Sequence, residues 1–136
     1  MSSDNKALVR RAYEAMGKGD FDALGALIAD DVVEHEVFPG LEPNKEGVLQ
    51  FFKILRSAFP DLTMTAHDMV SEGDKVFVRA TMAGTHEGEF MGMPATGRKI
   101  AVPIADFMRV KDGKFAEHWG VTDVAAMMEQ LGDTQD

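Results

Sequence analysis

The chain has 136 residues, of which 45% are hydrophobic and 27% are charged, and its formal net charge is −9. These proportions are typical of a soluble globular protein, and the length fits a single domain over residues 1–136. The acidic balance argues against nucleic acid and anionic membranes as partners, because both require clustered lysine and arginine. The chain has no cysteine, which excludes disulfides, a thiolate nucleophile and a cysteine-based zinc site.

We expect a cytoplasmic protein without a membrane span. No run of residues is apolar enough to cross a bilayer, and the segment from Met1 to Lys6 lacks the charged-then-apolar build of a signal peptide. Residues 1–4 and 133–136 are expected to be frayed tails, because chain ends are poorly ordered unless they are held.

The N-terminal part of the chain predicts two helices and a strand. Ser3 or Asp4 can cap a first helix, which ends at the run Gly17–Asp20. A second, short helix is expected from Phe21 to Ile28, and a strand from Val32 to Val37.

The third predicted helix, Lys45–Phe59, has the clearest pattern. Asn44 can cap it, and Pro60 stops it. Its apolar residues recur at the i, i+3, i+4, i+7 spacing of a helix that buries one face, and they are Val48, Phe51, Phe52, Leu55 and Phe59.

The remainder reads as antiparallel strands followed by a short helix. The expected strands are Leu62–Val70, Lys75–Thr85, Ile100–Val110 and Lys114–Val121, with a tight turn at Asp112–Gly113. Asp123 caps a last helix that runs to Leu131. Helices first and strands afterwards predict an α+β domain with helices against one side of a curved sheet.

Asp106 is the residue that most needs an explanation. Alternation along its strand places it on the same face as Ile100, Val102, Ile104 and Met108, which are all apolar. An ionised carboxylate facing an apolar interior costs several kcal/mol unless it is paired, hydrogen-bonded or protonated. Asp106 is therefore either a general acid or base, or a structural carboxyl held by hydrogen bonds.

His118 is the second candidate for chemistry. Alternation after the turn puts it on one side of its strand with Ala116 and Gly120, and a regular hairpin sets Asp106 opposite the neighbourhood of Trp119. A carboxyl and an imidazole in one pocket make a workable acid–base pair. The alternative is that His118 only hydrogen-bonds within the sheet.

The run Glu34–His35–Glu36 raises the question of a metal. On a strand, Glu34 and Glu36 share one face while His35 opposes them. Without cysteine, and without the spacing of a helical zinc motif, a zinc or iron site has little support, and we expect no metal.

Other side chains are candidates for the lining of a ligand pocket. Tyr13 can offer a hydroxyl or only pack its ring, and His86 either lines the pocket or lies exposed in a loop. Met91, Met93 and Met108 suit an adaptable lining for an awkward apolar ligand, or they fill an ordinary core.

The chain resembles the SnoaL-like polyketide cyclases and the broader ester cyclase group over nearly its whole length. The likeness lies in the segment Gly84–Arg98, in Phe107–Lys114, in Glu117-His118-Trp119 and in Gln130-Leu131-Gly132. It implies an NTF2-like fold, a conical α+β barrel whose helices pack on a strongly curved, mostly antiparallel sheet around an apolar pocket. It also implies aldol ring closure of a polyketide ester without metal or organic cofactor, and a homodimer as the default assembly.

The resemblance also locates the expected site. Family members use an Asp late in the final strand and a His on the preceding strand, and here Gly120 and Asp106 stand at those two positions. It implies that His35 or one of its glutamate neighbours reaches the pocket mouth. The candidate catalytic residues are therefore Asp106 and His118, and the candidate substrate-binding residues are Tyr13, Glu34, His35, His86, Met108 and Trp119.

Three functions follow as hypotheses. The first is a small-molecule enzyme of cyclase, isomerase or hydratase type that moves a proton with Asp106, assisted by His118, on an apolar carbonyl-bearing substrate. The second is a non-catalytic ligand-binding protein, which the missing carboxyl at Gly120 favours. The third is an interaction module that uses an exposed sheet face.

Overall fold

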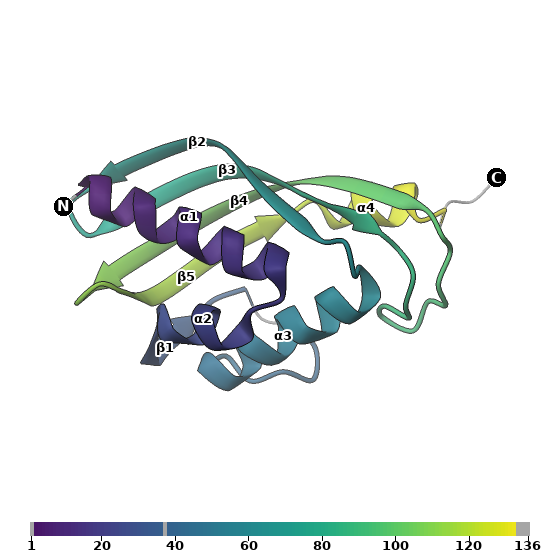
Figure 1. Ribbon diagram of the computed structural model, residues 1–136, viewed down its shortest axis with the longest axis horizontal. Coiled ribbons are helices and arrows are strands. Elements are labelled where there is room, and N and C mark those ends of the chain that lie inside the picture. Colours follow the sequence, from purple (N-terminus) through teal and green to yellow (C-terminus); the bar gives the residue numbers. More distant parts are fainter. Residues whose placement is uncertain (1, 37, 133–136) are drawn as a thin grey trace.

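The computed structural model of the chain describes residues 2–36 and 38–132. Its helices are α1 (Ser2–Lys18), α2 (Phe21–Ala26), α3 (Lys45–Ala58) and α4 (Val124–Gln130). Its strands are β1 (Ile28–Glu34), β2 (Thr63–Glu72), β3 (Lys75–Thr85), β4 (Lys99–Lys111) and β5 (Lys114–Thr122). The expected α+β class is confirmed (Figure 1). Among the described residues, no helix combines the length and apolar character needed to cross a membrane.

The strands form one curved, mixed sheet in the order β1-β5-β4-β3-β2. β1 runs parallel to β5, and the other neighbours are antiparallel. In Figure 1, α1 lies along the sheet, and α2 and α3 lie beside β1. The expected barrel is not closed, because no pairing joins the edge strands β1 and β2 within the described residues. The helices complete the enclosure instead.

The core lies between the helices and the concave face of the sheet. Alternate residues of β3 and β4 are buried there, as a strand with one solvated face requires. Buried apolar side chains of α1 and α3 pack on the same core, and they include Leu8, Val9, Ala12 and Leu55. Asp106 belongs to this inner face, as its strand periodicity predicts.

The ends of the first elements differ from the expectation. Helix α1 begins at Ser2, so Ser3 and Asp4 lie in its first turn and neither forms a tail or the predicted cap. Met1 and residues 133–136, the rest of the predicted tails, lie outside the described residues.

The second helix and the first strand also have different bounds. Helix α2 ends before Leu27, whose carbonyl accepts the Phe115 N–H at 2.9 Å, and Ile28 already pairs with β5. This pairing starts β1 at Ile28, earlier than the predicted Val32, because the neighbouring strand supplies partners that local propensity does not reveal. The predicted end of the strand, Val37, lies outside the described residues.

Helix α3 is close to its prediction. The Asn44 side chain accepts the Gly47 N–H at 3.0 Å and caps the first turn, as expected. The helix ends at Ala58, and Phe59 follows as a fully buried C-cap residue.

The hairpin between β4 and β5 contains a bulge that the sequence pattern does not reveal. Val110 pairs with Phe115, but Arg109 pairs with Glu117, so Ala116 is an extra residue on β5. Asp106 therefore lies opposite Gly120, one residue from Trp119 and within the neighbourhood that a regular hairpin predicts. The shift puts the side chain of His118 on the same face as Asp106.

Gly47 permits the close approach of helix α3 to the segment that follows β1. A Cβ at Gly47 would lie 1.8 Å from the backbone oxygen of Glu42, an overlap that only a backbone shift can remove. We expect Gly47→Ala to lower the free energy of unfolding by more than about 1 kcal/mol, as overpacked sites typically do. Urea denaturation measures the change.

The matched control is Gly17→Ala in helix α1, where the nearest atom to an added Cβ is 3.7 Å away. Alanine is the better helix former, so this variant should be neutral or stabilising. Equal denaturation midpoints for Gly47→Ala and the wild type would contradict the packing argument.

Candidate active site

A cavity of about 150 Å³ lies between the concave face of the sheet and the helices. Its lining is mostly apolar and rich in methionine, with Met16, Met64, Met82, Met91, Met108 and Met127. Met93 packs against the core and does not line the cavity. The cavity also holds a group of polar side chains, which are Tyr13, Glu34, Glu36, Asp106, His118 and Thr122. Such a mixture is typical of a small-molecule site, in which few polar groups orient an apolar ligand.

Asp106 is held by two partners inside this cavity. The Tyr13 hydroxyl donates to Asp106 Oδ2 at 2.5 Å, and His118 Nε2 lies 2.8 Å from Asp106 Oδ1. Only 14% of the Asp106 side chain is exposed. The Asp106 side chain projects from β4 and is thus held by one partner from helix α1 and one from strand β5.

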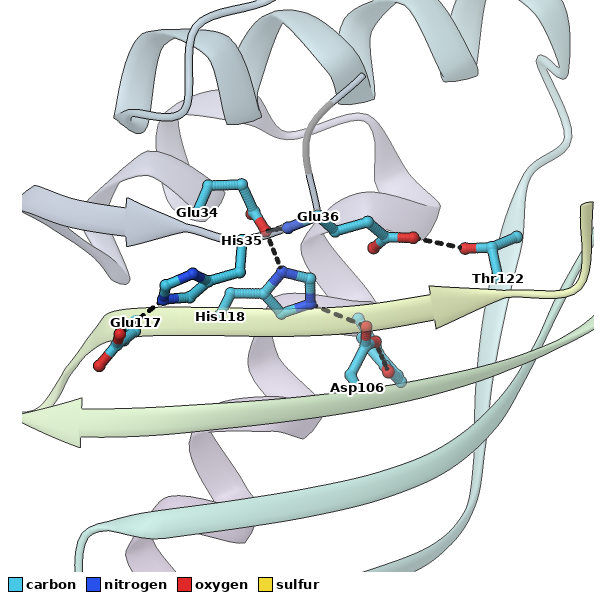
Figure 2. A network of polar contacts seen from close by, with 8 residues as sticks. Glu34, His35, Glu36, Asp106, Glu117, His118 and Thr122 are labelled. Carbon is cyan, nitrogen blue, oxygen red and sulfur yellow. Dashed lines mark hydrogen bonds and ion pairs between the residues drawn. The ribbon is translucent and has the colours of Figure 1, made fainter.

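His118 joins two carboxylates (Figure 2). Its Nδ1 lies 2.6 Å from Glu34 Oε2, while its Nε2 meets Asp106. Burial alone would lower the pKa of His118, but the hydrogen bonds and negative charges of Asp106 and Glu34 outweigh burial and raise the pKa from 6.5 to about 10. At neutral pH His118 is therefore an imidazolium that donates from both nitrogens.

Tyr13 keeps its proton. Burial, and then the negative charge and hydrogen bond of Asp106, raise the pKa of the Tyr13 hydroxyl well above its ordinary value. The hydroxyl is thus a permanent donor to Asp106.

Glu36 brings another carboxyl to the cavity. The Thr122 hydroxyl donates to Glu36 Oε2 at 3.0 Å. Burial is the main cause that raises the pKa of Glu36, and the charges of Asp106 and Glu34 act in the same direction. Figure 2 shows Glu36 beside His118, with its carboxyl directed toward Thr122.

One group of side chains has the composition of a metal site. One donor atom each from Glu36, Asp106 and His118 lie within 4.8 Å of one another. Both nitrogens of His118, however, are hydrogen-bonded to carboxylates, and the raised pKa keeps the ring protonated. An imidazolium has no lone pair for a metal, so the geometry favours an internal ion pair at neutral pH.

Two expected pocket residues lie on the other face of the sheet. The His35 ring stacks on Trp119 with 4.8 Å between ring centroids, and His35 Nε2 lies 2.6 Å from Glu117 Oε2. Neither His35 nor Trp119 lines the cavity, so their expected place in the pocket is wrong. The reason is alternation, since the neighbours Glu34 and Glu36 both point inward.

His86 is also absent from the cavity lining. It is fully buried, its Nδ1 accepts the backbone N–H of Thr96 at 3.2 Å, and its ring packs on Phe59. The expectations of a pocket residue and of an exposed loop histidine are both wrong, because the Thr96 segment folds back over it. Tyr13, Glu34 and Met108 do line the cavity, together with Asp106 and His118.

Sequence reasoning missed Thr122, and it left Glu36 out of the candidate binding residues although it expected His35 or one of the two glutamates at the pocket mouth. The signal for Glu36 was present, because Glu34 and Glu36 stand two positions apart and so share a strand face. Thr122 carries no comparable signal, since a threonine at a strand end is ordinary.

Comparisons with known proteins agree with this geometry. The model of the SnoaL-like polyketide cyclase family matches residues 7–131. The chain is 34% identical to the aklanonic acid methyl ester cyclase DauD of Streptomyces sp. (strain C5), over 93% of this chain and 80% of that protein. It is also 34% identical to the aklanonic acid methyl ester cyclase DnrD of Streptomyces peucetius, over 93% of this chain and 89% of that protein.

Solved structures with a similar fold agree with the family match. TsrD from Streptomyces laurentii superposes with a TM-score of 0.88 at 30% identity, and the match covers 97% of each chain. IdmH from Streptomyces antibioticus has a TM-score of 0.82 at 38% identity, over 93% of this chain and 97% of that chain. The family match, the relatives and the shared fold lead to one conclusion: the chain belongs to the SnoaL-like polyketide cyclase family of small-molecule enzymes.

Proposed function

We propose that the chain is a cofactor-independent cyclase that closes a ring in an apolar, polyketide-like methyl ester by intramolecular aldol chemistry. The observation that carries this proposal is the Asp106 carboxylate, held between Tyr13 and His118 inside a mostly apolar cavity. The two ester cyclase relatives, each 34% identical over 93% of the chain, support the choice of cyclisation over isomerisation or hydration.

Asp106 is the proposed general base. Its two donors orient the carboxyl group, and each oxygen retains a lone pair that can accept a proton. The surrounding apolar lining limits the access of water to the reacting atoms. Asp106 takes a proton from the carbon next to a substrate carbonyl, and the resulting enolate attacks a second carbonyl of the same molecule.

His118 supports this step through its charge. Because its pKa is raised to about 10, it is an imidazolium at neutral pH and not a second base. A fixed positive charge beside the site where an enolate develops stabilises that negative charge without reorganisation. His118 thus assists Asp106 by position and charge.

The alternative of a non-catalytic binding protein loses its support. It rested on the absence of a carboxyl at Gly120, but the carboxyl of Glu36 lies directly against that glycine. The alternative of an interaction module with a collapsed interior is disfavoured by the open cavity.

We further propose a homodimer that forms through the outer face of the sheet. Val70, Phe77, Phe107 and Trp119 are cross-strand neighbours there and form an outer apolar row across β2, β3, β4 and β5. Val70 is 66% exposed, and Val121, on the same face of β5, is 71% exposed. A contiguous apolar surface of this kind marks an association site, and two identical rows can cover each other about a two-fold axis.

The first test replaces the proposed base. Asp106→Asn keeps the shape but cannot accept the proton, so turnover should fall by at least about 100-fold while the protein stays folded. The assay follows ring closure of aklanonic acid methyl ester by chromatography and mass spectrometry. Asp68→Asn is the matched control, because that carboxylate pairs with Arg79 on the exposed outer face. Full activity of Asp106→Asn, or no ring closure by the wild type on methyl esters of this class, would contradict the proposal.

The second test follows stability against pH. The folded-state pKa of His118 lies above its ordinary value, so its ion pairs contribute stability that is fully present below about pH 6.5 and is lost as pH rises through about 10. His118→Asn should therefore be most destabilising near pH 6 and progressively less so toward pH 10, as measured by urea denaturation. His67→Asn, which removes an exposed histidine beside Thr81 and outside the cavity, is the matched control. A constant difference between His118→Asn and the wild type would refute the charge assignment.

The third test concerns the assembly. The double variant Val70→Glu/Val121→Glu places charges in the proposed interface without touching the core. It should therefore be monomeric by light scattering under conditions in which the wild type is dimeric. Ile54→Glu is the control, because Ile54 is 41% exposed on helix α3, away from this face. A wild type that is monomeric at micromolar concentration, or a double variant that stays dimeric, would exclude this interface.

A further inference from the structure

We infer that Glu36 is a second catalytic residue, a general acid that protonates the carbonyl oxygen of the substrate while Asp106 removes a proton from carbon. The inference deepens the proposed function and depends on it. It stands on the position of the Glu36 carboxyl against Gly120, on its hydrogen bonds and on the charges around it.

The backbone aims Glu36 into the cavity. It follows the end of β1, which runs beside β5, and it shares its side of the chain with Glu34. The Glu36 N–H donates to Glu34 Oε2 at 2.9 Å, which ties the two residues together. Thr122 then holds the far end of the side chain through its hydroxyl.

Gly120 makes the room for this carboxyl. A Cβ at Gly120 would lie 2.2 Å from Glu36 Oε1 and 3.0 Å from Glu36 Cδ. Gly120 is not among the glycines with positive φ, so its backbone conformation does not require glycine. Close approach of side chains is the remaining reason for a glycine within a strand: the Glu36 carboxyl comes nearest, and His118 Cε1 would lie 2.8 Å from the added Cβ. The glycine thus brings the Glu36 carboxyl to the residue opposite Asp106.

The hydrogen bonds at the site make Glu36 the carboxyl best placed to carry a proton. The two N–H donors of His118 are taken by Glu34 and Asp106, which leaves Glu36 with the neutral Thr122 hydroxyl. Burial is the largest cause that raises the pKa of Glu36; the charges of Asp106 and Glu34 add to it, while the Thr122 hydrogen bond and the charge of His118 act against it. Since Oε2 accepts from Thr122, Oε1 is the oxygen available to hold the proton.

The step balances without any other reactant. Asp106 takes the proton of the carbon next to one carbonyl, and the electrons of that C–H bond form the enolate. The enolate carbon bonds to the second carbonyl carbon, whose C=O π bond breaks, and its oxygen takes the proton of Glu36. Asp106 is then protonated and Glu36 is ionised. The proton returns from Asp106 to Glu36, which each have a carboxylate oxygen within 4.8 Å of the other. The product is an isomer of the substrate.

Glu36→Gln tests the role with little change in shape. Glutamine can still accept from Thr122 but cannot donate an acidic proton, so kcat should fall by about 100-fold with KM nearly unchanged. The pH–rate profile should also lose the alkaline limb that reports deprotonation of Glu36, whereas the fall near pH 10, where His118 loses its charge, should remain. Glu117→Gln is the control, because Glu117 pairs with His35 on the other face. Wild-type kcat, or a reduced kcat with the alkaline limb intact, would overturn the role.

A relocated carboxyl gives a sharper test. Gly120→Asp alone should lose activity, because its Cβ overlaps Glu36, and Glu36→Ala alone should lose the acid. The double variant Glu36→Ala/Gly120→Asp removes the overlap with Glu36, leaves only a small shift of the His118 ring to be made, and restores a carboxyl to the same space. It should therefore recover at least about tenfold over Glu36→Ala. A folded double variant no more active than Glu36→Ala would contradict the assignment.

A spectroscopic readout separates this inference from the proposed function. With ¹³C-labelled glutamate, one side-chain carboxyl signal of the protein should titrate above the others and be absent in Glu36→Gln. It should persist in Asp106→Asn, moved toward lower pH, because one neighbouring charge is gone. A Glu36 signal that titrates with the exposed glutamates refutes the inference whether or not ring closure is observed, whereas an inactive wild type with the high signal refutes only the cyclase reaction.

Discussion

The site depends on one partly buried imidazolium shared between two carboxylates. His118, on β5, bonds to Glu34 on β1 and to Asp106 on β4, so a single ring ties together three adjacent strands. Removing these charges from water costs free energy. That desolvation penalty is offset because each N–H group of the ring has an oppositely charged partner. Tyr13 adds a donor from helix α1 and links the ion pairs to the helical layer. Loss of the ring would leave Glu34 and Asp106 without their shared cation, and with only neutral donors, the Glu36 N–H and the Tyr13 hydroxyl.

Two local irregularities of β5 bring this arrangement about. The extra residue Ala116 shifts the register of the hairpin and turns His118 to the concave face, toward Asp106. Gly120 then leaves space for a carboxyl that arrives from the end of β1 and not from β5 itself. The carboxyl of Glu36, from the segment after β1, thus lies beside the strand position at which the resemblance to the family led us to expect an Asp. Glu36 differs from Glu34 and Asp106 because its side-chain hydrogen-bond partner is the neutral Thr122 hydroxyl and not the His118 ring.

Much of the fold and part of the site could be predicted from the sequence. Helix α3 was predictable because its cap and its apolar period agree, and Asp106 stood out because strand alternation alone puts it among apolar residues. The bulge at Ala116 was not predictable, since nothing in the residue types marks an extra residue in the ladder. His35 and Trp119 were misplaced because their stacking depends on the parallel pairing of β1 with β5, which is a long-range contact. His86 was misplaced for the same reason, since its cover comes from the segment around Thr96.

The most direct test of this account is the titration of the His118 ring by ¹⁵N NMR, with the signal assigned from its absence in His118→Asn. The account predicts that both ring nitrogens stay protonated through pH 8 and that the ring titrates near the raised pKa of about 10. A ring that loses a proton near its ordinary pKa of about 6.5 would show that the carboxylates do not hold it as a cation, and the proposed charge arrangement of the site would be wrong.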